Sequence, residues 1–381
     1  MAINRRQFGA AALAFGVAGC SGGPSTGPQG TAPSPLPDDL RPARNAGYAS
    51  WVAKFRSRAR AQGFSDALLD SAFRGAGYLP GAVTRDRNQT EFTRTLEDYL
   101  SIAVSDERVS KGRAAFARHR TTLAAVERKY GVPAQIVTAI WGLESFYGER
   151  RGNVPVISAT STLAYDGRRG QFFESQLIAA LKILARGDVT ARAMTGSWAG
   201  AMGHTQFIPT SYLAYAVDFT GDGRRDIWSE DPSDSLASTA AYLSRNGWQS
   251  GLNWGGEVEA TTPATGVIQP QPGGPRFYTT GNFRAIKRYN NSDSYAIGVG
   301  HLADRIAGGP PLRAGFPPDR YGLTKDDRIA LQQGLTANGF DIGHADGVIG
   351  PKTREAISAF QNRKGLPVTG DPSLALLRQL S

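Results

Sequence analysis

Residues 138–150 read TAIWGLESFYGER and place one carboxylate, Glu144, among large apolar and aromatic side chains. Apolar residues recur here at spacings of three and four, which predicts a helix that starts at Pro133 and carries Glu144 on its apolar stripe. A carboxylate is costly to bury in such a stripe unless it is paired or protonated. Spacing alone leaves two interpretations open: a helix-end glutamate that pairs with Arg150 or Arg151, or a desolvated carboxyl that donates a proton near neutral pH.

The surrounding region, up to residue 306, is predicted to be mostly helical because the same apolar spacing recurs along it. The segments with this pattern are 66–76, 94–104, 113–131, 133–148 and 173–187. Residues 251–284 instead carry Gly, Pro, Thr and alternating apolar residues, which predicts loops with short strands. The expected fold class is therefore mainly α, with a small loop- and β-containing segment.

The N-terminus resembles a lipoprotein export signal. A basic start precedes an apolar run too short to span a bilayer, and residues 17–20 (VAGC) resemble a bacterial lipobox, in which lipid is attached to the cysteine after cleavage. Cys20 is the only cysteine of the sequence, so no intrachain disulfide is possible. We expect a signal peptide over 1–20 and a flexible Gly/Pro/Ser/Thr-rich tether over 21–40. The protein would then be lipid-anchored and face the periplasm, and Ser21 favours the outer membrane of a Gram-negative bacterium.

Composition divides the remaining chain into a large and a small domain. A large domain, which the resemblance described below identifies as catalytic, is expected over 41–306, a Pro/Gly-rich linker over 307–323 and a small module over 324–381. The formal net charge of +10 favours anionic partners such as a cell-wall polymer or a membrane surface. Basic residues are not interleaved with aromatic ones as in a nucleic-acid groove, so no nucleic-acid partner is expected.

Five blocks of the large domain are similar, in the same order, to the B family of membrane-bound lytic murein transglycosylases. They are AIWGLESFYG (139–148), RRGQFFESQLIAAL (168–181), GSWAGAMGHTQFIPTSY (196–212), DFTGDGRRDIW (218–228) and RYNNSDSYAIGVGHLADRI (288–306). The resemblance runs from about residue 45 to 306 and implies a lysozyme-like helical core. It also implies cleavage of the bond between N-acetylmuramic acid and N-acetylglucosamine in peptidoglycan, with 1,6-anhydro ends as products and Glu144 as the single catalytic acid and base.

The same resemblance implies a set of substrate contacts. The matching positions are Tyr99, Arg168, Arg169, Ser197, Gln206, Phe207, Tyr242, Tyr289, Asn290 and Tyr295. Taken without the family, the tyrosines could be core residues and the two arginines a solvated pair. His204 departs from the pattern because glutamine is expected there. An imidazole still forms hydrogen bonds, but its charge could make activity sensitive to pH.

Residues 218–229 half-match a calcium-binding loop. The candidate oxygen ligands are Asp218, Thr220 and Asp222, with Asp226 or Asp234 as further candidates if the loop is longer than usual. Ser229 stands at position 12, where such a loop normally has a bidentate glutamate. Some family members bind calcium in such a loop, whereas an Asp/Gly-rich turn held by its own hydrogen bonds would use the same residues. No cofactor is required by the expected chemistry, and calcium stays a candidate.

Residues 324–381 carry three short helical patterns. The stretch DGVIGPKTREAISAFQ (346–361) resembles the small three-helix peptidoglycan-binding domain, and a structural cap is the alternative. Such a module holds no catalytic constellation, so its expected role is to keep the enzyme on its polymer.

The function expected from the whole sequence is that of a lytic murein transglycosylase bound to peptidoglycan glycan strands and, through its lipid, to a membrane. One rival is a hydrolytic muramidase on the same fold, which would use water and a second carboxylate. The candidates for that carboxylate are Glu149, Asp166 and Glu174. The other rival is a non-catalytic, wall-binding lipoprotein. Scattered histidines and the lack of HExxH and GxSxG motifs argue against zinc-peptidase and serine-hydrolase chemistry. The sequence identifies no partner among cell-wall synthesis or division proteins.

Overall fold

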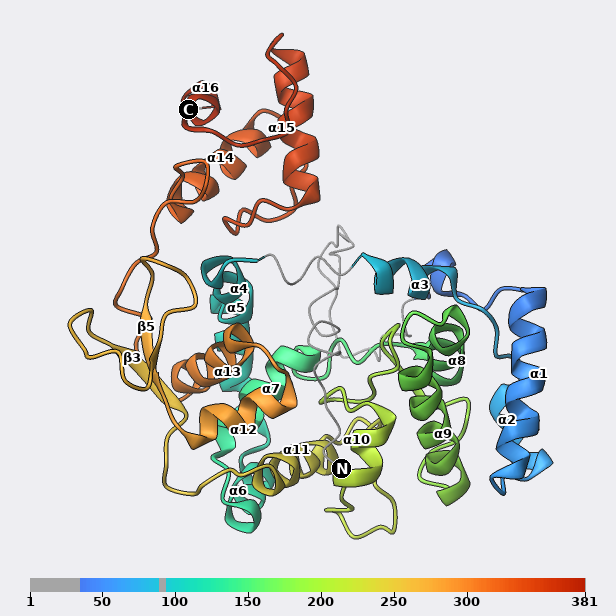
Figure 1. The fold of residues 1–381 in the computed structure, drawn as a ribbon. Helices are drawn as coiled ribbons and strands as arrows, with labels where there is room; N and C mark the ends of the chain where they lie inside the picture. The colour runs from blue at the N-terminus through green and yellow to red at the C-terminus, as the bar shows by residue number, and fades with distance from the viewer. Residues whose placement is uncertain (1–34, 89–93, 381) are drawn as a thin grey trace, which may run out of the picture.

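The computed structural model describes residues 35–88 and 94–380, so the predicted signal peptide, Cys20 and residues 21–34 of the predicted tether lie outside the described residues. Helices dominate the described chain, which confirms the mainly α fold class (Figure 1). The helices before residue 307 are η1 (Asp38–Leu40), α1 (Ala46–Ala61), α2 (Asp66–Phe73), α3 (Pro80–Arg87), α4 (Leu96–Ala103), α5 (Asp106–Arg118), α6 (Arg120–Tyr130), α7 (Ala134–Ser145), α8 (Val156–Asp166), α9 (Gly170–Arg186), α10 (Pro209–Tyr215), α11 (Ser233–Arg245), α12 (Gly281–Tyr289) and α13 (Asp293–Ile306). Within the described ranges, no helix is both long and apolar enough to cross a membrane.

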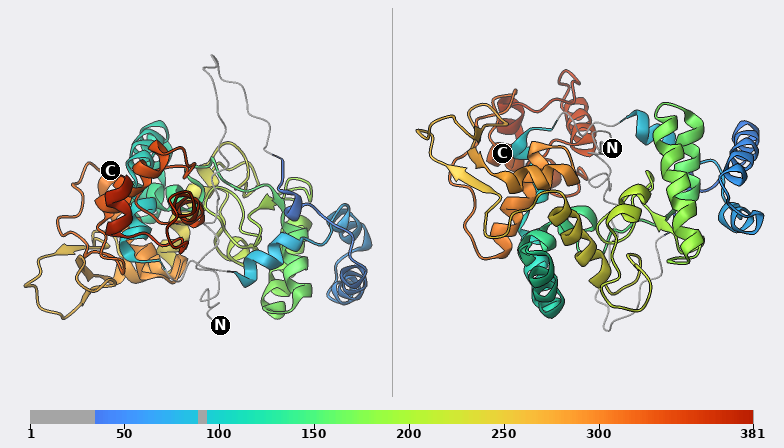
Figure 2. Two further views of the ribbon diagram at one scale, coloured as in Figure 1. Left: turned by 90° about the horizontal axis from the view of Figure 1, so that it is seen from above. Right: turned by 60° about the horizontal axis from the view of Figure 1, so that its bottom comes forward.

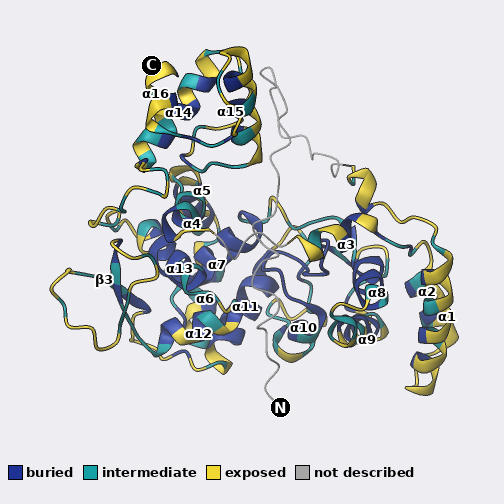
Figure 3. Cartoon of the chain, turned by 45° about the horizontal axis from the view of Figure 1, so that its top comes forward, coloured by how far each residue is buried: buried dark blue, intermediate teal, exposed yellow. Residues whose placement is uncertain are grey.

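Helix α7 lies at the centre of the largest core cluster. Eleven of its 12 residues are buried, and it packs against α13, α5, α11 and α6. Figure 3 shows α7 and α13 as the darkest, most buried helices of this region, whereas α1 is largely exposed. The helix begins after Pro133, as predicted, because proline suits a helix start. It ends at Ser145, since Phe146 and Tyr147 have positive φ values of 53° and 59°. Side chains after Ser145 therefore no longer follow the helical stripe.

The pattern over 113–131 predicted one helix, but the structure has two. Helix α5 ends at Arg118 and α6 begins at Arg120, with His119 between them outside helical geometry at φ −104° and ψ 20°. The ring of His119 packs edge-on against Trp141 of α7, with 5.3 Å between ring centroids. One residue outside the helix hardly changes the spacing of the apolar residues on either side, so periodicity did not reveal the break.

A second, smaller core cluster lies around α8 and includes residues that precede it, such as Leu79, and residues that follow it, such as Phe173 and Trp198. Helix α8 carries buried hydroxyl groups that fasten those segments. Thr162 Oγ1 accepts from the backbone N–H of Leu79 at 3.0 Å, and Ser161 Oγ lies 2.7 Å from the hydroxyl of Tyr48. Leu40 is also buried here, so the packed chain begins within the range assigned to the tether. Figure 2 shows α1 and α2 at the edge of the molecule, beside α8 and α9.

The strands are short and form two antiparallel sheets. They are β1 (Val154–Pro155), β2 (Thr195–Gly196), β3 (Gly255–Val258), β4 (Val267–Ile268) and β5 (Arg276–Thr279). The larger sheet has the order β3-β5-β4, with Gly256 opposite Tyr278 and Ile268 opposite Phe277. This sheet lies within 251–284, where loops and short strands were predicted. Phe277 is fully buried and joins the sheet to the main core.

The C-terminal module has its own core and three helices, as predicted. They are α14 (Lys325–Ala337), α15 (Pro351–Arg363) and α16 (Leu374–Leu380). Thr324 and Asp327 form a capping box at the start of α14. Leu331, Ile357 and Phe360 are fully buried in this core.

An ion-pair cluster joins the C-terminal module to the large domain. The guanidinium of Arg328 on α14 is only 3% exposed and lies 2.6 Å from the Glu97 carboxylate of α4. Asp98 and Asp319 lie 3.5 and 3.4 Å from the same guanidinium. The predicted linker is also attached to the large domain, since the backbone N–H of Arg313 donates to a Glu257 oxygen at 2.9 Å. The module therefore contacts α4, the helix that carries Tyr99.

Candidate active site

Glu144 lies in the last turn of α7 and faces α13. Its side chain is buried, with 6% of the residue exposed, and its Oε1 accepts a hydrogen bond from the hydroxyl of Tyr295 at 2.6 Å. Ser292 caps α13 by accepting from the backbone N–H of Tyr295, which places this tyrosine in the first turn. Burial, and then the charge of Glu144, raises the pKa of Tyr295 well above its usual value, so its hydroxyl stays a donor.

The two arginines considered as partners of Glu144 are engaged elsewhere. Arg151 forms an ion pair with Glu230, and the guanidinium of Arg150 lies 4.5 Å from the centre of the Phe146 ring. Neither arginine is therefore the partner expected for Glu144, whose Oε1 accepts instead from Tyr295 of α13.

Three predicted aromatic residues form one cluster. The rings of Tyr242 and Tyr289 lie 4.9 Å apart, and Phe207 lies 6.1 and 5.9 Å from them. The tyrosine hydroxyls are fixed to backbone carbonyls: Tyr289 donates to Thr205 at 2.6 Å and Tyr242 to Arg288 at 2.5 Å. All three residues are buried. The cluster therefore joins the end of α12 to α11 and to the loop that carries Thr205.

Two further predicted residues, Tyr99 and Asn290, lie against α13 and just before it in the chain, respectively. A Cβ atom on Gly298 would lie 2.8 Å from the Tyr99 ring, so this glycine lets Tyr99 pack closely onto α13, one turn after Tyr295. Asn290 follows α12 directly, and its buried side-chain oxygen has no hydrogen-bond partner among the described residues. A buried acceptor without a donor is costly in a folded protein, which makes this oxygen a candidate contact for a ligand N–H.

Ser197 and Gln206 lie in the loop region around β2. Ser197 Oγ accepts from the backbone N–H of Ala201 at 3.1 Å, and Gln206 Nε2 donates to the carbonyls of Arg151 at 3.0 Å and Gly203 at 2.9 Å. Gln206 has a positive φ of 51°. These side chains hold the backbone of the loop, so a role in shaping the site accompanies any contact with substrate.

Arg168 and Arg169 lie in another part of the molecule, at the turn between α8 and α9. Arg168 Nε lies 2.5 Å from the carboxylate of Asp86 on α3, and Arg169 forms an ion pair with the same carboxylate. Burial raises the pKa of Asp86, but hydrogen bonds from the two guanidinium groups outweigh this and hold the pKa below its usual value. Sequence reasoning missed Asp86, because nothing in the local pattern connects it to arginines more than 80 residues later.

His204, the departure from the family pattern, is buried beside α7. Nδ1 lies 3.2 Å from the indole nitrogen of Trp141, and Nε2 lies 2.8 Å from the carbonyl of Ser229. Burial lowers the pKa of His204 to about 4. The ring is therefore neutral at neutral pH, and the expected pH sensitivity moves into the acid range. The contact with Trp141 was not predicted, since the two residues lie on separate elements.

The three carboxylates considered for a hydrolytic mechanism each pair with a basic residue from another helix. The pairs are Lys111–Glu149 at 2.8 Å, Arg87–Asp166 at 2.6 Å and Arg58–Glu174 at 2.9 Å. These pairs explain the positions of the three carboxylates by local charge compensation.

The carboxylates of the predicted calcium loop accept hydrogen bonds from the loop's own backbone. Asp218 accepts from the N–H of Gly223 at 2.8 Å, Asp222 accepts from the N–H two residues later at 2.9 Å, and Asp234 accepts from the N–H of Thr220 at 3.2 Å. In residues 35–88 and 94–380, no group of three or more His, Cys, Asp or Glu residues could hold a metal ion. These hydrogen bonds hold the loop as an Asp/Gly-rich turn, and calcium binding stays a prediction.

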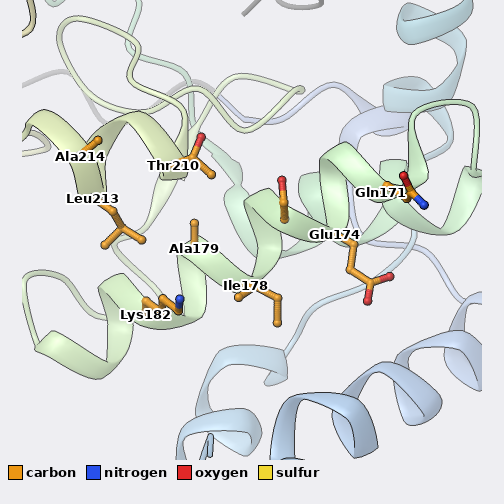
Figure 4. A pocket seen from close by; sticks show the side chains of 9 residues that line it. Gln171, Glu174, Ile178, Ala179, Lys182, Thr210, Leu213 and Ala214 are labelled. Atoms are coloured by element: carbon orange, nitrogen blue, oxygen red, sulfur yellow. The ribbon is translucent and has the colours of Figure 1, made fainter. Parts of the chain in front are cut away.

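A cavity of about 750 Å³ is lined by residues of α9 and α10 (Figure 4). Its lining mixes apolar side chains such as Ile178 and Leu213 with the charged Glu174 and Lys182. Neither Glu144 nor any of the predicted substrate-binding residues lines this cavity, whereas Glu174, a candidate for the second carboxylate of a hydrolase, does.

Comparison with known proteins identifies a family for each of the two domains. Residues 47–269 and 261–304 match the family of the transglycosylase SLT domain, and residues 324–380 match the peptidoglycan binding domain family. The membrane-bound lytic murein transglycosylase B of Escherichia coli (strain K12) is 30% identical over 242 residues, which are 55% of this chain and 66% of that protein.

Solved structures resemble the chain over more of its length. SltB3 from Pseudomonas aeruginosa, in complex with NAG-NAM-pentapeptide, is 43% identical, with 88% of this chain and 100% of that chain covered and a TM-score of 0.69. SltB1, a soluble lytic transglycosylase from the same organism, is 32% identical, covers 68% of this chain and 98% of its own, and gives a TM-score of 0.62. The Escherichia coli lytic transglycosylase Slt35, in complex with calcium, is 26% identical, with 70% and 94% covered and a TM-score of 0.58. The chain therefore belongs to the transglycosylase SLT domain family and carries a peptidoglycan-binding domain at its C-terminal end.

Proposed function

We propose that this chain is a peptidoglycan lytic transglycosylase with Glu144 as its single acid and base. The observation that carries the proposal is the buried carboxyl of Glu144, held by the Tyr295 hydroxyl at 2.6 Å in a chain of the transglycosylase SLT domain family. The substrate is the bond between N-acetylmuramic acid and N-acetylglucosamine. The NAG-NAM-pentapeptide bound to SltB3 supports this assignment.

The position of Glu144 suits a proton donor. Burial disfavours a charged carboxylate, and the carbonyl end of α7, where Glu144 lies, disfavours a negative charge as well. Protonated Glu144 gives its proton to the glycosidic oxygen while the bond from that oxygen to C1 breaks. The substrate's own N-acetyl group stabilises the positive charge at C1, so no second carboxylate is needed.

The same carboxyl then acts as a base. Ionised Glu144 takes the proton of the muramic acid 6-hydroxyl as that oxygen bonds to C1 and closes the 1,6-anhydro ring. The hydrogen bond from Tyr295 stabilises this ionised state. The side-chain oxygen of Asn290, which has no hydrogen-bond partner among the described residues, would accept from the N–H of the N-acetyl group.

The product identifies the reaction. A transglycosylase product weighs one water less than the hydrolysis product, so mass analysis of fragments released from purified peptidoglycan decides between the two reactions. Glu144→Gln should lower activity by about 100-fold or more, the usual contribution of a positioned acid–base group. Reducing-end muramic acid of ordinary mass from the wild type would establish a hydrolytic muramidase. Full activity of Glu144→Gln would show that another residue is the acid.

A lipid anchor at Cys20 is part of the proposal. The VAGC stretch after a short apolar run supports it, and one relative is named as membrane-bound. Lipid on Cys20 would hold the enzyme on the periplasmic side of the outer membrane, within reach of the wall. Cys20→Ala should then release the protein from the membrane fraction. A variant that still sediments with membranes as the wild type does would refute the anchor.

A further inference from the structure

The imidazole of His204 uses both of its nitrogens to bridge two separate segments. Nδ1 lies 3.2 Å from the indole nitrogen of Trp141, and Nε2 lies 2.8 Å from the carbonyl oxygen of Ser229. An indole N–H can only donate and a carbonyl can only accept. Nδ1 therefore accepts and Nε2 carries the proton, a pattern that only the neutral ring provides.

The backbone around His204 also contacts the end of α7. The hydroxyl of Ser145 donates to the carbonyl of His204 at 2.5 Å, and the N–H of Gly148 donates to the same hydroxyl at 3.0 Å. A Cβ atom on Gly148 would lie 2.6 Å from the Nδ1 of His204, so glycine is required for this approach. His204 thus contacts α7 on both sides of Glu144: its ring bonds to Trp141, three residues before, and its carbonyl bonds to Ser145, one residue after.

Arg151 fixes the other side of the imidazole. Its NH1 group lies 3.0 Å from the carbonyl of Trp228 and 2.8 Å from that of Ser229, which use its two N–H donors. NH1 also lies 3.2 Å from Nε2 of His204. Because both groups carry their protons toward carbonyl oxygens, this approach is not a hydrogen bond. A positive charge on the His204 ring would be repelled by the guanidinium of Arg151.

The charged and titratable groups around His204 favour the neutral ring. Burial lowers its pKa to about 4, against the opposing effect of the hydrogen bond to Ser229, and Arg151 adds to the lowering. Glu230 forms an ion pair with Arg151, which limits the repulsion between Arg151 and a protonated His204 ring. The ring of His119 packs against Trp141, the other hydrogen-bond partner of His204. His119 itself has a pKa lowered by burial, so it adds little positive charge.

We infer that His204 is a positioning residue for Glu144: its neutral imidazole ties Trp141 to Ser229 and so fixes the last turn of α7 that presents the catalytic carboxyl. This inference rests on the proposed function. A glutamine in place of His204 can accept from Trp141 through its carbonyl and donate to Ser229 through its amide. A leucine fills a similar volume but offers neither group.

The test compares His204→Gln and His204→Leu in cleavage of soluble glycan strands. Loss of the bridge leaves the buried indole N–H of Trp141 without its acceptor, so His204→Leu should lower kcat by about tenfold or more with KM within about threefold of the wild type. His204→Gln should return kcat to within about threefold of the wild type. Trp141→Phe, which removes the indole N–H together with part of the buried ring, should reproduce most of the loss.

His301→Leu is a matched control. His301 lies on α13 and lines a separate cavity of about 450 Å³, and burial also lowers its pKa to about 4. A buried neutral histidine takes up a proton on unfolding, so the wild type loses stability as pH falls from 6.5 towards 4. Either leucine variant should therefore show a weaker fall of melting temperature over this range, whereas only His204→Leu should lose kcat.

Two results would overturn the inference: a His204→Leu enzyme with kcat within about twofold of the wild type, or a His204→Gln enzyme as slow as His204→Leu. If His204→Leu does not fold, Trp141→Phe decides, and an unchanged kcat there would overturn it. The mass of the wild-type product, measured in the same assay, tests the proposed function separately. A hydrolytic product would refute that function, and the kcat comparison would still report on positioning.

Discussion

Tyr295→Phe removes one atom from the contact that orients Glu144. The hydroxyl of Tyr295 donates to Oε1 of Glu144 at 2.6 Å, and the two residues are 3% and 6% exposed. Phenylalanine keeps the ring and its packing between α13 and α7. The variant therefore leaves a buried carboxyl oxygen without this donor and changes little else.

The size of the effect follows from that lost donor. Loss of a hydrogen bond to a charged group costs about 1.5–3 kcal/mol, and 1.36 kcal/mol corresponds to a tenfold change in rate, so kcat should fall by about 10- to 150-fold. The hydrogen bond stabilises the ionised carboxylate more than the neutral acid, because charge-assisted hydrogen bonds are the stronger ones. The loss should therefore appear in kcat, whose second step needs the ionised form, more than in KM.

The assay is release of 1,6-anhydro fragments from soluble glycan strands, with kcat and KM determined separately. Tyr278→Phe serves as the matched control, since Tyr278 is on β5 and its hydroxyl accepts from Asn253, away from Glu144. The control should keep full activity. A Tyr295→Phe enzyme whose kcat stays within about twofold of the wild type would refute the argument that this hydroxyl orients the acid.

The remaining predictions concern the C-terminal module and calcium. Arg328→Met leaves Glu97 buried without its cation, which costs about 3–5 kcal/mol when a buried pair is broken, so the melting temperature should fall, and an unchanged melting curve would contradict the burial of this pair. Deletion of 320–381 should weaken binding to intact sacculi and leave cleavage of soluble fragments nearly unchanged; a folded truncation without activity would show that the module is part of the active site. Millimolar calcium should not raise the melting temperature, because Ser229 stands where a calcium loop has its bidentate glutamate and Asp218 accepts hydrogen bonds from the loop backbone. A rise of several degrees that Asp222→Ala abolishes would reverse this conclusion.

Local patterns predicted the parts of the fold that depend on local physics. Pro133 marked the start of α7, the apolar periodicity located most helices, and the composition of 251–284 predicted the short strands. The end of α7 was missed because positive φ at Phe146 and Tyr147 is imposed by tertiary contacts. Tyr147, for example, reaches the carbonyl of Arg108 at 2.7 Å.

The partners of the polar residues could not be predicted, for a different physical reason. Periodicity shows which face of a helix is buried, but it does not show which group fills the space opposite. Tyr295 lies 151 residues after Glu144, and the arginines that hold Asp86 follow it by 82 and 83 residues. The resemblance to a family supplied Glu144 and Tyr295 as site residues, and it also flagged His204 as unusual. Only the packed structure connects that histidine to Trp141 and Ser229. Glutamine and neutral histidine share the one property that this bridge needs, because each offers one acceptor and one donor on a planar group.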